Sequence, residues 1–440
     1  MNPSHPPLHP APPSPGTVLV LGGDGFIAGF AIAALRARGW RVLRGVRAVG
    51  RALREDERRC DLAAMTVPAQ WRDALSGVDA VVNAAGILRA SRRQTFDAVH
   101  VDGPLALARA CVEAGVRRFV QISSVGDPAD GPFIASKHRF DAALLALPLS
   151  AVVLRPALVY SASGSYGGSS LLRALAALPS GVAVPGDGGW PQQPVAAEDL
   201  GELVARALDS EARGTFEVAG PQRMPLRDYL LAWRRWLRLP GARVWRVPMP
   251  IAGAGVMLGE AFGGGPIGAT TWRMLRRGVV VGEDALPRLR AAFGFVPRAL
   301  ADALAARPSQ VQDRWQAHLY FVAPLLKTGV VALWLLSAWA GFATPAAEIE
   351  RLAAGSPLAG AAPVALARAG AGLDLVLGLW LASGRRPRAC LALMLASVLA
   401  YTLAFGLLLP AQWLDPLGGL AKNLVVLPAL AALWGLSDRR

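Results

Sequence analysis

The sequence contains very few lysines and cysteines. Arginine supplies nearly all of the positive charge behind the formal net charge of +15, and lysine occurs only at positions 137, 327 and 422. The cysteines, at positions 60, 111 and 390, form no CxxC pair and no metal-ligand spacing, so we predict neither a disulfide framework nor a metal site. Reduced thiols fit a cytosolic compartment. No basic stripe and no nucleic-acid motif accompanies the charge, so we expect no nucleic-acid partner and favour a surface suited to anionic lipid.

The first residues lack the features of a signal peptide. Residues 1–16 are rich in proline and contain neither an apolar core nor a cleavage-like site. A segment of this composition buries too little apolar surface to fold, so we predict a disordered leader.

Long hydrophobic runs, by contrast, are abundant in the last third of the chain. Four of them each approach the ~20 apolar residues that a helix needs to cross a bilayer. They cover residues 321–343, 363–383, 389–409 and 417–436. We therefore predict an all-α membrane domain of four transmembrane helices over residues 315–440.

The charges of the loops predict an orientation. Arg385, Arg386 and Arg388 follow the second run and Arg439-Arg440 end the chain, whereas the other two connections carry little positive charge. The positive-inside rule then places both chain ends and the second connection in the cytoplasm. We expect a multi-pass protein of a bacterial inner membrane, with the lipid bilayer as a partner.

One acidic residue, Asp374, lies near the middle of the second hydrophobic run. Ionisable groups inside a membrane are costly and usually face a partner or a cavity. Our hypothesis is that Asp374 pairs with Arg368 or Lys422, either as a structural ion pair or as part of a polar pocket for a quinone.

Strands and helices alternate in the N-terminal part. Strands are expected over residues 17–21, 41–46, near 60, 78–82, 119–122 and 151–154, with helices over 26–38, 94–114 and 133–147. This spacing predicts an α/β domain over residues 17–314, built on a doubly wound parallel sheet of the Rossmann type. Residues 247–265 are apolar but interrupted by prolines and glycines, and we interpret them as core or membrane-surface packing.

A glycine turn joins the first strand to the first helix. In Gly22-Gly23-Asp24-Gly25-Phe26-Ile27-Ala28, Gly22 permits a tight turn, Gly25 lets the backbone approach a pyrophosphate, and Ala28 allows close helix packing. The helix N-terminus offers unsatisfied N–H groups to phosphate, so Gly22, Gly25, Phe26 and Ile27 are predicted to bind a dinucleotide. Asp24 departs from the pattern, because a carboxylate here repels phosphate unless it points outward.

Arginines stand where NAD-binding domains usually place an acid. The end of the second strand reads Arg44-Gly45-Val46-Arg47, and no acid occurs before Glu55. Arginine at this position suits a 2′-phosphate, so Arg44 and Arg47 favour NADP(H) over NAD(H).

Taken together, the motifs of residues 17–300 resemble the extended and atypical short-chain dehydrogenase/reductase family. Besides the glycine turn they are Asp61-Leu62, Asn83-Ala84-Ala85-Gly86, Ser123-Ser124 and Arg155-Pro156. The resemblance implies that Asp61 and Leu62 lie at the adenine and that Asn83 to Gly86 line the middle of the cofactor. The most similar branch includes the nucleotide-binding accessory subunit of mitochondrial complex I. Residues 316–436, with Pro416-Leu417-Gly418-Gly419 and Lys422-Asn423, resemble a DoxX-like membrane domain, a class similar to subunits associated with quinone-linked oxidation.

The catalytic pair of the family, Tyr-x-x-x-Lys, is incomplete. Phe133 replaces the tyrosine, while Lys137 remains and by resemblance also binds the nicotinamide ribose. Three interpretations stay open: altered acid/base chemistry by Lys137, Ser123 or Ser124; replacement of the phenol by Tyr160 or Tyr166; or cofactor binding without catalysis.

These features predict a membrane-anchored NAD(P)(H)-binding oxidoreductase that reduces a small carbonyl or a quinone-like substrate. The alternative is a non-catalytic nucleotide-binding anchor, or an assembly factor for a membrane redox complex. Phe133 favours the alternative, whereas the glycine turn and Lys137 favour the enzyme.

Overall fold

The computed structural model describes residues 15–48, 50–262, 268–355, 357–408, 410–414 and 419–437. The predicted leader, apart from its last two residues, lies outside the described residues. The chain divides into two compact units, Met1–Ala317 and His318–Arg440, and each is described by itself.

Seven parallel strands form the main sheet of the first unit, in the order β11-β6-β5-β4-β1-β2-β3. They are β1 (Thr17–Leu21), β2 (Arg41–Val46), β3 (Glu57–Arg59), β4 (Ala80–Asn83), β5 (Arg118–Ile122), β6 (Ala151–Pro156) and β11 (Gly214–Val218). The chain order reverses between β1 and β4, which confirms the predicted doubly wound fold. A ligand crevice is expected where the carboxyl ends of these two strands meet.

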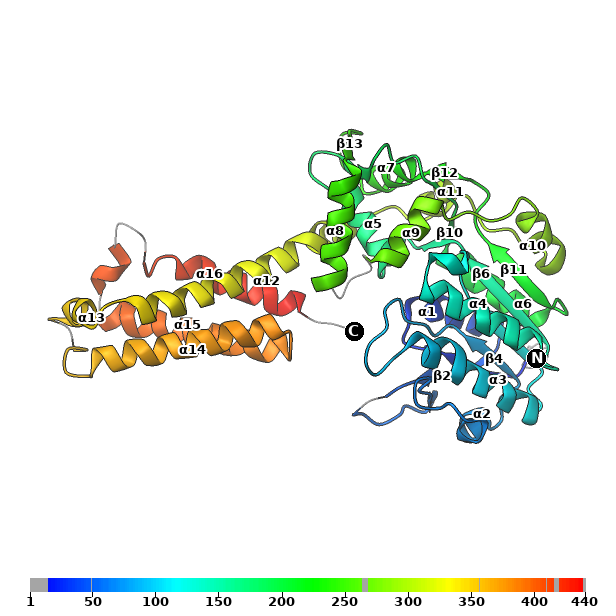
Figure 1. The fold of residues 1–440 in the computed structure, drawn as a ribbon, viewed down its shortest axis with the longest axis horizontal. Coiled ribbons are helices and arrows are strands. Elements are labelled where there is room, and N and C mark those ends of the chain that lie inside the picture. Colours follow the sequence, from blue (N-terminus) through cyan, green and yellow to red (C-terminus); the bar gives the residue numbers. More distant parts are fainter. Residues whose placement is uncertain are drawn as a thin grey trace, which may run out of the picture. The chain divides into compact units, whose positions relative to one another are not determined.

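Helices cover both faces of this sheet (Figure 1). One face carries α1 (Phe26–Ala37), α6 (Ala197–Asp209) and α10 (Ala285–Phe293), and the other α2 (Arg72–Leu75), α3 (Gly103–Glu113) and α4 (Pro132–Leu145). Side chains of β1 alternate between the two cores: Val18 and Val20 enter the first, Leu19 and Leu21 the second. Each such burial contributes about 1.5–3 kcal/mol relative to an exposed side chain. Short helical turns η1 (Pro68–Trp71), η2 (Ala98–Asp102) and η3 (Pro128–Asp130) complete this layer.

A smaller lobe follows β6. It contains the strand pairs β7 (Leu158–Tyr160) with β10 (Pro194–Ala196), β8 (Val182–Pro185) with β13 (Val244–Val247), and β9 (Pro191–Gln192) with β12 (Met224–Pro225), together with α5 (Gly168–Ala176), α7 (Leu226–Trp236) and α11 (Leu300–Ala305). Its core centres on Tyr229, Trp233 and Trp236 and includes Ala317. The first turns of α12 (Val311–Ala343) are therefore part of this lobe.

The apolar stretch 247–265 forms a helix on the surface of the lobe. Helix α8 (Met249–Phe262) is followed by α9 (Ala269–Arg277). Ile251, Met257 and Leu258 of α8 are more than half exposed, so the interpretation as core packing is wrong. Membrane-surface packing stays a prediction, and residues 263–265 lie outside the described residues.

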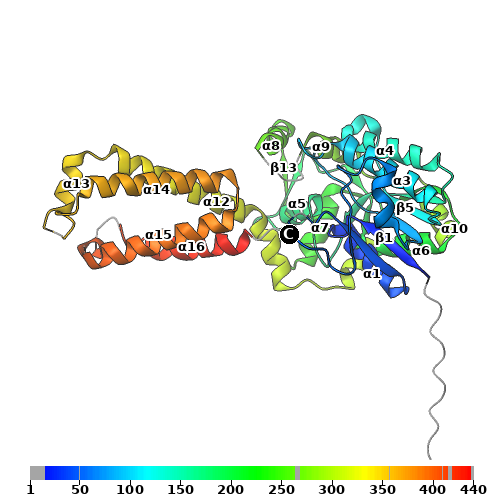
Figure 2. The same ribbon diagram turned by 90° about the horizontal axis from the view of Figure 1, so that it is seen from below.

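The second unit is helical, as predicted (Figure 2). It contains most of α12, then α13 (Ala346–Ala353), α14 (Pro363–Ser383), α15 (Pro387–Leu408), η4 (Pro410–Leu414) and α16 (Asn423–Leu436). Apolar side chains of α12, α14, α15 and α16 share one core. Of the described helices, three are long and apolar enough to cross a membrane: α12, α14 and α15.

The predicted fourth span over residues 417–436 is wrong in its length. Helix α16 begins at Asn423 and has 14 residues, and residues 417 and 418 lie outside the described residues. At ~1.5 Å per residue such a helix measures about 21 Å, which is short of the ~30 Å hydrocarbon core of a bilayer.

The predicted ion pair of Asp374 is also wrong. The Ser337 hydroxyl donates to Asp374 Oδ2 over 2.6 Å. Arg368 instead donates to the carbonyl oxygens of Gly341 and Thr344 at the end of α12. Among the described residues no ion pair links Asp374 to Arg368 or Lys422. A partly buried arginine can satisfy its guanidinium on backbone carbonyls left free at a helix end, which sequence spacing does not reveal.

Candidate functional site

The glycine turn closes tightly between β1 and α1. Gly22 has φ +69°, and a Cβ there would lie 2.9 Å from Ala85 Cα. The Gly25 amide donates to the Gly22 carbonyl over 2.6 Å, and no side chain caps the N-terminus of α1. The amides that open the helix at Phe26 and Ile27 are therefore left for a ligand, which suits a pyrophosphate.

The segment Asn83–Gly86 lies against this turn. The buried Asn83 donates its amide hydrogen to Gln121 Oε1 over 2.8 Å, and its Oδ1 accepts the Ala85 amide at 3.2 Å. These bonds hold the backbone of Ala84 and Ala85 beside Gly22, at the switch between β1 and β4. The residues present fit an extended dinucleotide at this edge.

Asp61 and Leu62 follow β3. The Asp61 carboxylate accepts the Ala63 amide at 3.1 Å, which leaves its other oxygen available. The Leu62 carbonyl is packed so closely against Gly103 that a Cβ at residue 103 would lie 2.1 Å away. Glycine at the start of α3 thus fixes the loop that carries Asp61.

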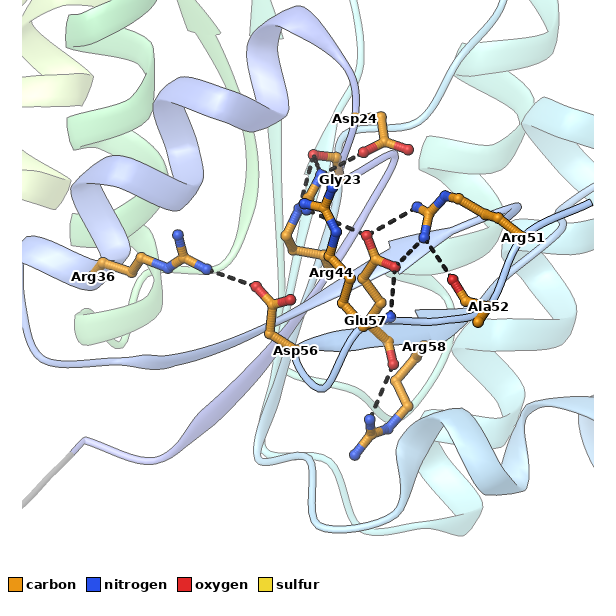
Figure 3. A network of polar contacts seen from close by, with 10 residues as sticks. Gly23, Asp24, Arg36, Arg44, Arg51, Ala52, Asp56, Glu57 and Arg58 are labelled. Carbon is orange, nitrogen blue, oxygen red and sulfur yellow. Dashed lines mark hydrogen bonds and ion pairs between the residues drawn. The ribbon is translucent and has the colours of Figure 1, made fainter. Parts of the chain in front are cut away.

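An arginine–carboxylate network occupies the end of β2 (Figure 3). Arg44 contacts the Gly23 carbonyl, forms a short ion pair with Asp24 and lies 3.4 Å from Glu57. Arg51 binds the same Glu57 carboxylate at 2.6 Å. Hydrogen bonds from Arg51 and the Arg54 amide lower the pKa of Glu57 to about 2.

This network changes the prediction for Arg44 and Arg47. Glu57 lies on β3, the strand beside β2, so its contact with Arg44 is not evident from the residues at the end of the second strand. Two carboxylates already oppose the charge of Arg44, whereas Arg47 is exposed beyond the strand. A cofactor phosphate at Arg44 therefore has to compete with Asp24.

Lys137 lies buried between Gly86, in the loop after β4, and the end of β5. Its Nζ donates to the Ile122 carbonyl over 3.0 Å and lies 5.8 Å from the ring centroid of Phe133. A Cβ at Gly86 would lie 3.4 Å from the same Nζ. Burial lowers the pKa of Lys137 to about 8, and the nearby Asp141 carboxylate partly offsets this shift.

The two serines after β5 differ in their contacts. The buried Ser123 donates to Asp141 Oδ2 over 2.8 Å, and Arg155 forms an ion pair with the same oxygen at 2.8 Å. Within the part of the chain that the structure describes, the hydroxyl of the half-buried Ser124 donates to the neighbouring Val125 carbonyl, at 3.1 Å, and to no side chain. Ser124 therefore has the more available hydroxyl.

His100 is a site residue that sequence reasoning missed. Its Nε2 accepts the Ile87 amide at 3.0 Å, so Nδ1 carries the proton and donates to Ser136 Oγ over 2.9 Å. Ser136 in turn donates to the Phe133 carbonyl. Burial, with a smaller effect of Lys137, lowers the pKa of His100 to about 3. No sequence motif marks His100, because its position is set by hydrogen bonds to Ser136 on α4 and to Ile87 in the loop after β4.

Protonation of His100 should make the fold less stable in acid. An unfolded histidine has a pKa of ~6.5, so between pH 6.5 and 3 the unfolded chain binds a proton that the folded chain excludes. The free energy of unfolding should then fall by about 1.4 kcal/mol per pH unit in this window. Urea unfolding at pH 7 and at pH 5 measures how much the free energy of unfolding decreases between these two pH values. In His100→Gln this decrease should be about 2 kcal/mol smaller than in the unmodified protein. His138→Gln, at a half-buried histidine of α4, is the control, and an unchanged decrease in His100→Gln contradicts the assignment.

Tyr160 and Tyr166 lie in different environments. Tyr160 is fully buried in the lobe core against Trp233, and burial raises the pKa of its phenol. It is packed away from solvent and is a poor substitute for the missing phenol. Tyr166 is exposed in the loop before α5.

Comparisons with known proteins agree with the division of the chain into two units. Residues 18–219 match the NAD dependent epimerase/dehydratase family, and residues 331–434 match the DoxX-like family. The solved structure of gox2253 is 21% identical with a TM-score of 0.51, and that of Pal from Bacillus thuringiensis is 16% identical with a TM-score of 0.50. Each comparison covers 66% of this chain and 96% of the other, and shows the fold alone.

A protein with a named activity is also similar to part of the chain. A ceramide reductase from Caulobacter vibrioides is 30% identical over 149 residues, which is 33% of this chain. The match covers 47% of the reductase, about half of its length.

Proposed function

We propose, from the premise that this chain joins an N-terminal domain of the NAD dependent epimerase/dehydratase family to a C-terminal DoxX-like domain, that it is a membrane-bound reductase. It would transfer hydride from a nicotinamide dinucleotide to a carbonyl group on a lipid-soluble molecule. The observation that carries this proposal is the buried Lys137, held between Gly86 and the Ile122 carbonyl at the formed cofactor edge.

The cofactor would be held by groups that the fold has already positioned. Gly22, Gly25 and the first amides of α1 suit the pyrophosphate, Asp61 and Leu62 flank the adenine position, and Asn83 to Gly86 line the middle. When bound, a nicotinamide dinucleotide would supply hydride to the carbonyl carbon. The carbonyl oxygen then requires a proton from the protein.

Lys137 and Ser124 are the residues proposed to serve that oxygen. With a pKa of about 8, the Lys137 ammonium can donate a proton near neutral pH. Ser124 can orient the carbonyl oxygen through its hydroxyl. Ser123 would act at a distance by fixing Asp141, which lies near Lys137 and favours its charged form.

The relative and the membrane unit support a lipid-like substrate. A ceramide reductase acts, by its name, on a lipid, and three of the described helices are long and apolar enough to cross a bilayer. We propose a ketone-bearing lipid as the first substrate to test and a quinone as the second. The proposed location is a bacterial inner membrane, with the nucleotide-binding unit in the cytoplasm.

Cofactor choice is proposed to depend on Asp24. NADP(H) remains the favoured cofactor because Arg44 and Arg47 are the cations at the end of β2, but Asp24 competes for Arg44. Asp24→Asn should therefore strengthen NADPH binding relative to NADH about three- to fivefold, the range of a partly exposed ion pair. Asp56→Asn, which removes the exposed carboxylate partner of Arg36 nearby, should leave the ratio unchanged. If Asp24→Asn and Asp56→Asn show the same ratio of NADPH to NADH binding, this role of Asp24 is contradicted.

A second function, a non-catalytic anchor for a membrane redox complex, is favoured by Phe133. The phenylalanine keeps a ring beside Lys137 and removes the exchangeable proton of the family's tyrosine. The full chain in lipid nanodiscs distinguishes the two functions when NADPH and NADH consumption are followed with a ketone-bearing ceramide and with a quinone. Consumption with either substrate supports the reductase, and cofactor binding without consumption supports the anchor.

A further inference from the structure

The surface of the first unit carries an apolar helix, α8, with one face that no described residue of this unit covers. Residues 247–259 contain no charged side chain. Within α8, Ile251, Met257 and Leu258 are 63%, 73% and 59% exposed. Residues 251, 254, 257 and 258 lie within one side of the helix at a period of 3.6 residues, so they form one outward face, while Ala252, Val256 and Gly259 are more buried on the other side. Contiguous exposed apolar surface of this kind usually marks a binding surface.

The residues around this face are those of a membrane interface. Trp245, immediately before α8, is 40% exposed, and the Arg243 guanidinium lies 4.2 Å from its ring. Arg246, on β13 before α8, and Arg276, on α9 after it, are also exposed. Apolar residues on one face, with tryptophan and arginine at the border, are typical of helices that lie in the headgroup region of anionic bilayers.

The chain itself brings this lobe to a membrane. The beginning of α12 belongs to the lobe core: Ala317 is buried there, and Asp313 lies 4.0 Å from the buried Arg173. The same helix continues without interruption to Ala343, and only residues 318–320 separate Ala317 from the apolar run that begins at residue 321. At ~1.5 Å per residue, the lobe core ends within about one helical turn of that run.

We propose that α8 lies on the bilayer, with Ile251, Met257 and Leu258 inserted among the lipid headgroups and upper acyl chains. The bilayer is the occupant favoured here, because the face combines apolar and cationic groups and the chain has its own spans. This inference does not depend on the proposed reductase activity.

The end of α8 is also connected to the functional site. Arg89, in the loop after Asn83–Gly86, donates to the Gly259 carbonyl at 3.1 Å. The Glu260 carboxylate accepts the amide of Ala269, where α9 begins. A Cβ at Gly131, just before α4, would lie 2.8 Å from Thr270 Oγ1 of α9. A helix lying on lipid would therefore bring the loop after Asn83–Gly86 and the start of α4 close to the bilayer surface, which suits a substrate that arrives from the membrane.

Lipid-borne quenchers test the position of α8 in the full chain. Met257→Cys is labelled with bimane in proteoliposomes of phosphatidylglycerol and phosphatidylcholine, the latter doxyl-labelled on its acyl chain. The native cysteines Cys60, Cys111 and Cys390 are buried and should not react. Val67→Cys, at an exposed apolar residue before η1 in the same unit, is the matched control.

We expect doxyl lipid to quench the probe at 257 about two- to threefold more than the probe at 67, and aqueous iodide to show the reverse order, as for a helix buried ~5–10 Å into the interface. Equal quenching at both positions overturns the proposal. Protection of position 257 from both quenchers also overturns it, because that result indicates that protein, such as a second copy of the chain, covers α8. Gel filtration of each labelled variant confirms that it remains folded.

Discussion

Replacement of Lys137 by methionine should reduce carbonyl reduction by at least about 100-fold, the scale of a lost general acid. Methionine keeps the length of the side chain beside Phe133 and removes the charge. The activity should fall mainly through a lower kcat, because the glycine turn and Asn83–Gly86 still bind the cofactor. The measurement is NADPH consumption by the full chain in nanodiscs with a ketone-bearing ceramide.

The pH dependence of the unmodified protein provides an independent check on Lys137. Its pKa of about 8 means that the ammonium is present below that pH and is lost as the pH rises through it. Activity should therefore fall above about pH 8. A Lys137→Met protein that consumes NADPH at the normal rate would remove Lys137 from the proposed mechanism.

Restoring the tyrosine at position 133 should increase activity. Phe133→Tyr would add a phenol to a ring whose centroid lies 5.8 Å from Lys137 Nζ. The ammonium favours the ionised phenol, so the new group can exchange a proton nearer neutral pH. We expect kcat to rise about 100-fold, within the range of one positioned acid/base group.

The control for this gain is Phe96→Tyr, which adds a phenol to an aromatic ring that packs edge-to-face with Phe133, 6.3 Å between centroids. It should leave kcat unchanged. If Phe133→Tyr also leaves kcat unchanged while the cofactor is bound, the missing phenol does not limit this protein, and the anchor function gains support.

The fold was largely predictable because its signals are local. The strand at residues 17–21, the helix that starts at Phe26 and the glycines between them follow from apolar periodicity and turn chemistry within a short segment. The doubly wound sheet followed because alternating strands and helices have few allowed connections. The membrane unit followed from the length of the apolar runs, although length alone overestimated the fourth helix.

The site was less predictable because its important contacts are not local. Glu57 reaches Arg44 across the pairing of β2 with β3, a strand of three residues with weak sequence character. His100 reaches Ser136 from a different helical segment. Tyr160 looked like a pocket residue because a glycine-rich loop follows it, yet its ring enters the lobe core. The proposed roles of Lys137, Ser123 and Ser124 remain predictions.

The central claim is that the edge between β1 and β4 binds a nicotinamide dinucleotide. Its most direct test is the titration of the purified full chain with NADPH and NADH, followed by cofactor fluorescence. Gly22→Ala should weaken binding at least about tenfold, because φ +69° and the 2.9 Å approach to Ala85 exclude a side chain. Gly29→Ala, on the exposed side of α1 with no atom within 4 Å of its Cβ position, should bind as the unmodified protein does. Failure of the folded, unmodified chain to bind either cofactor would contradict the account.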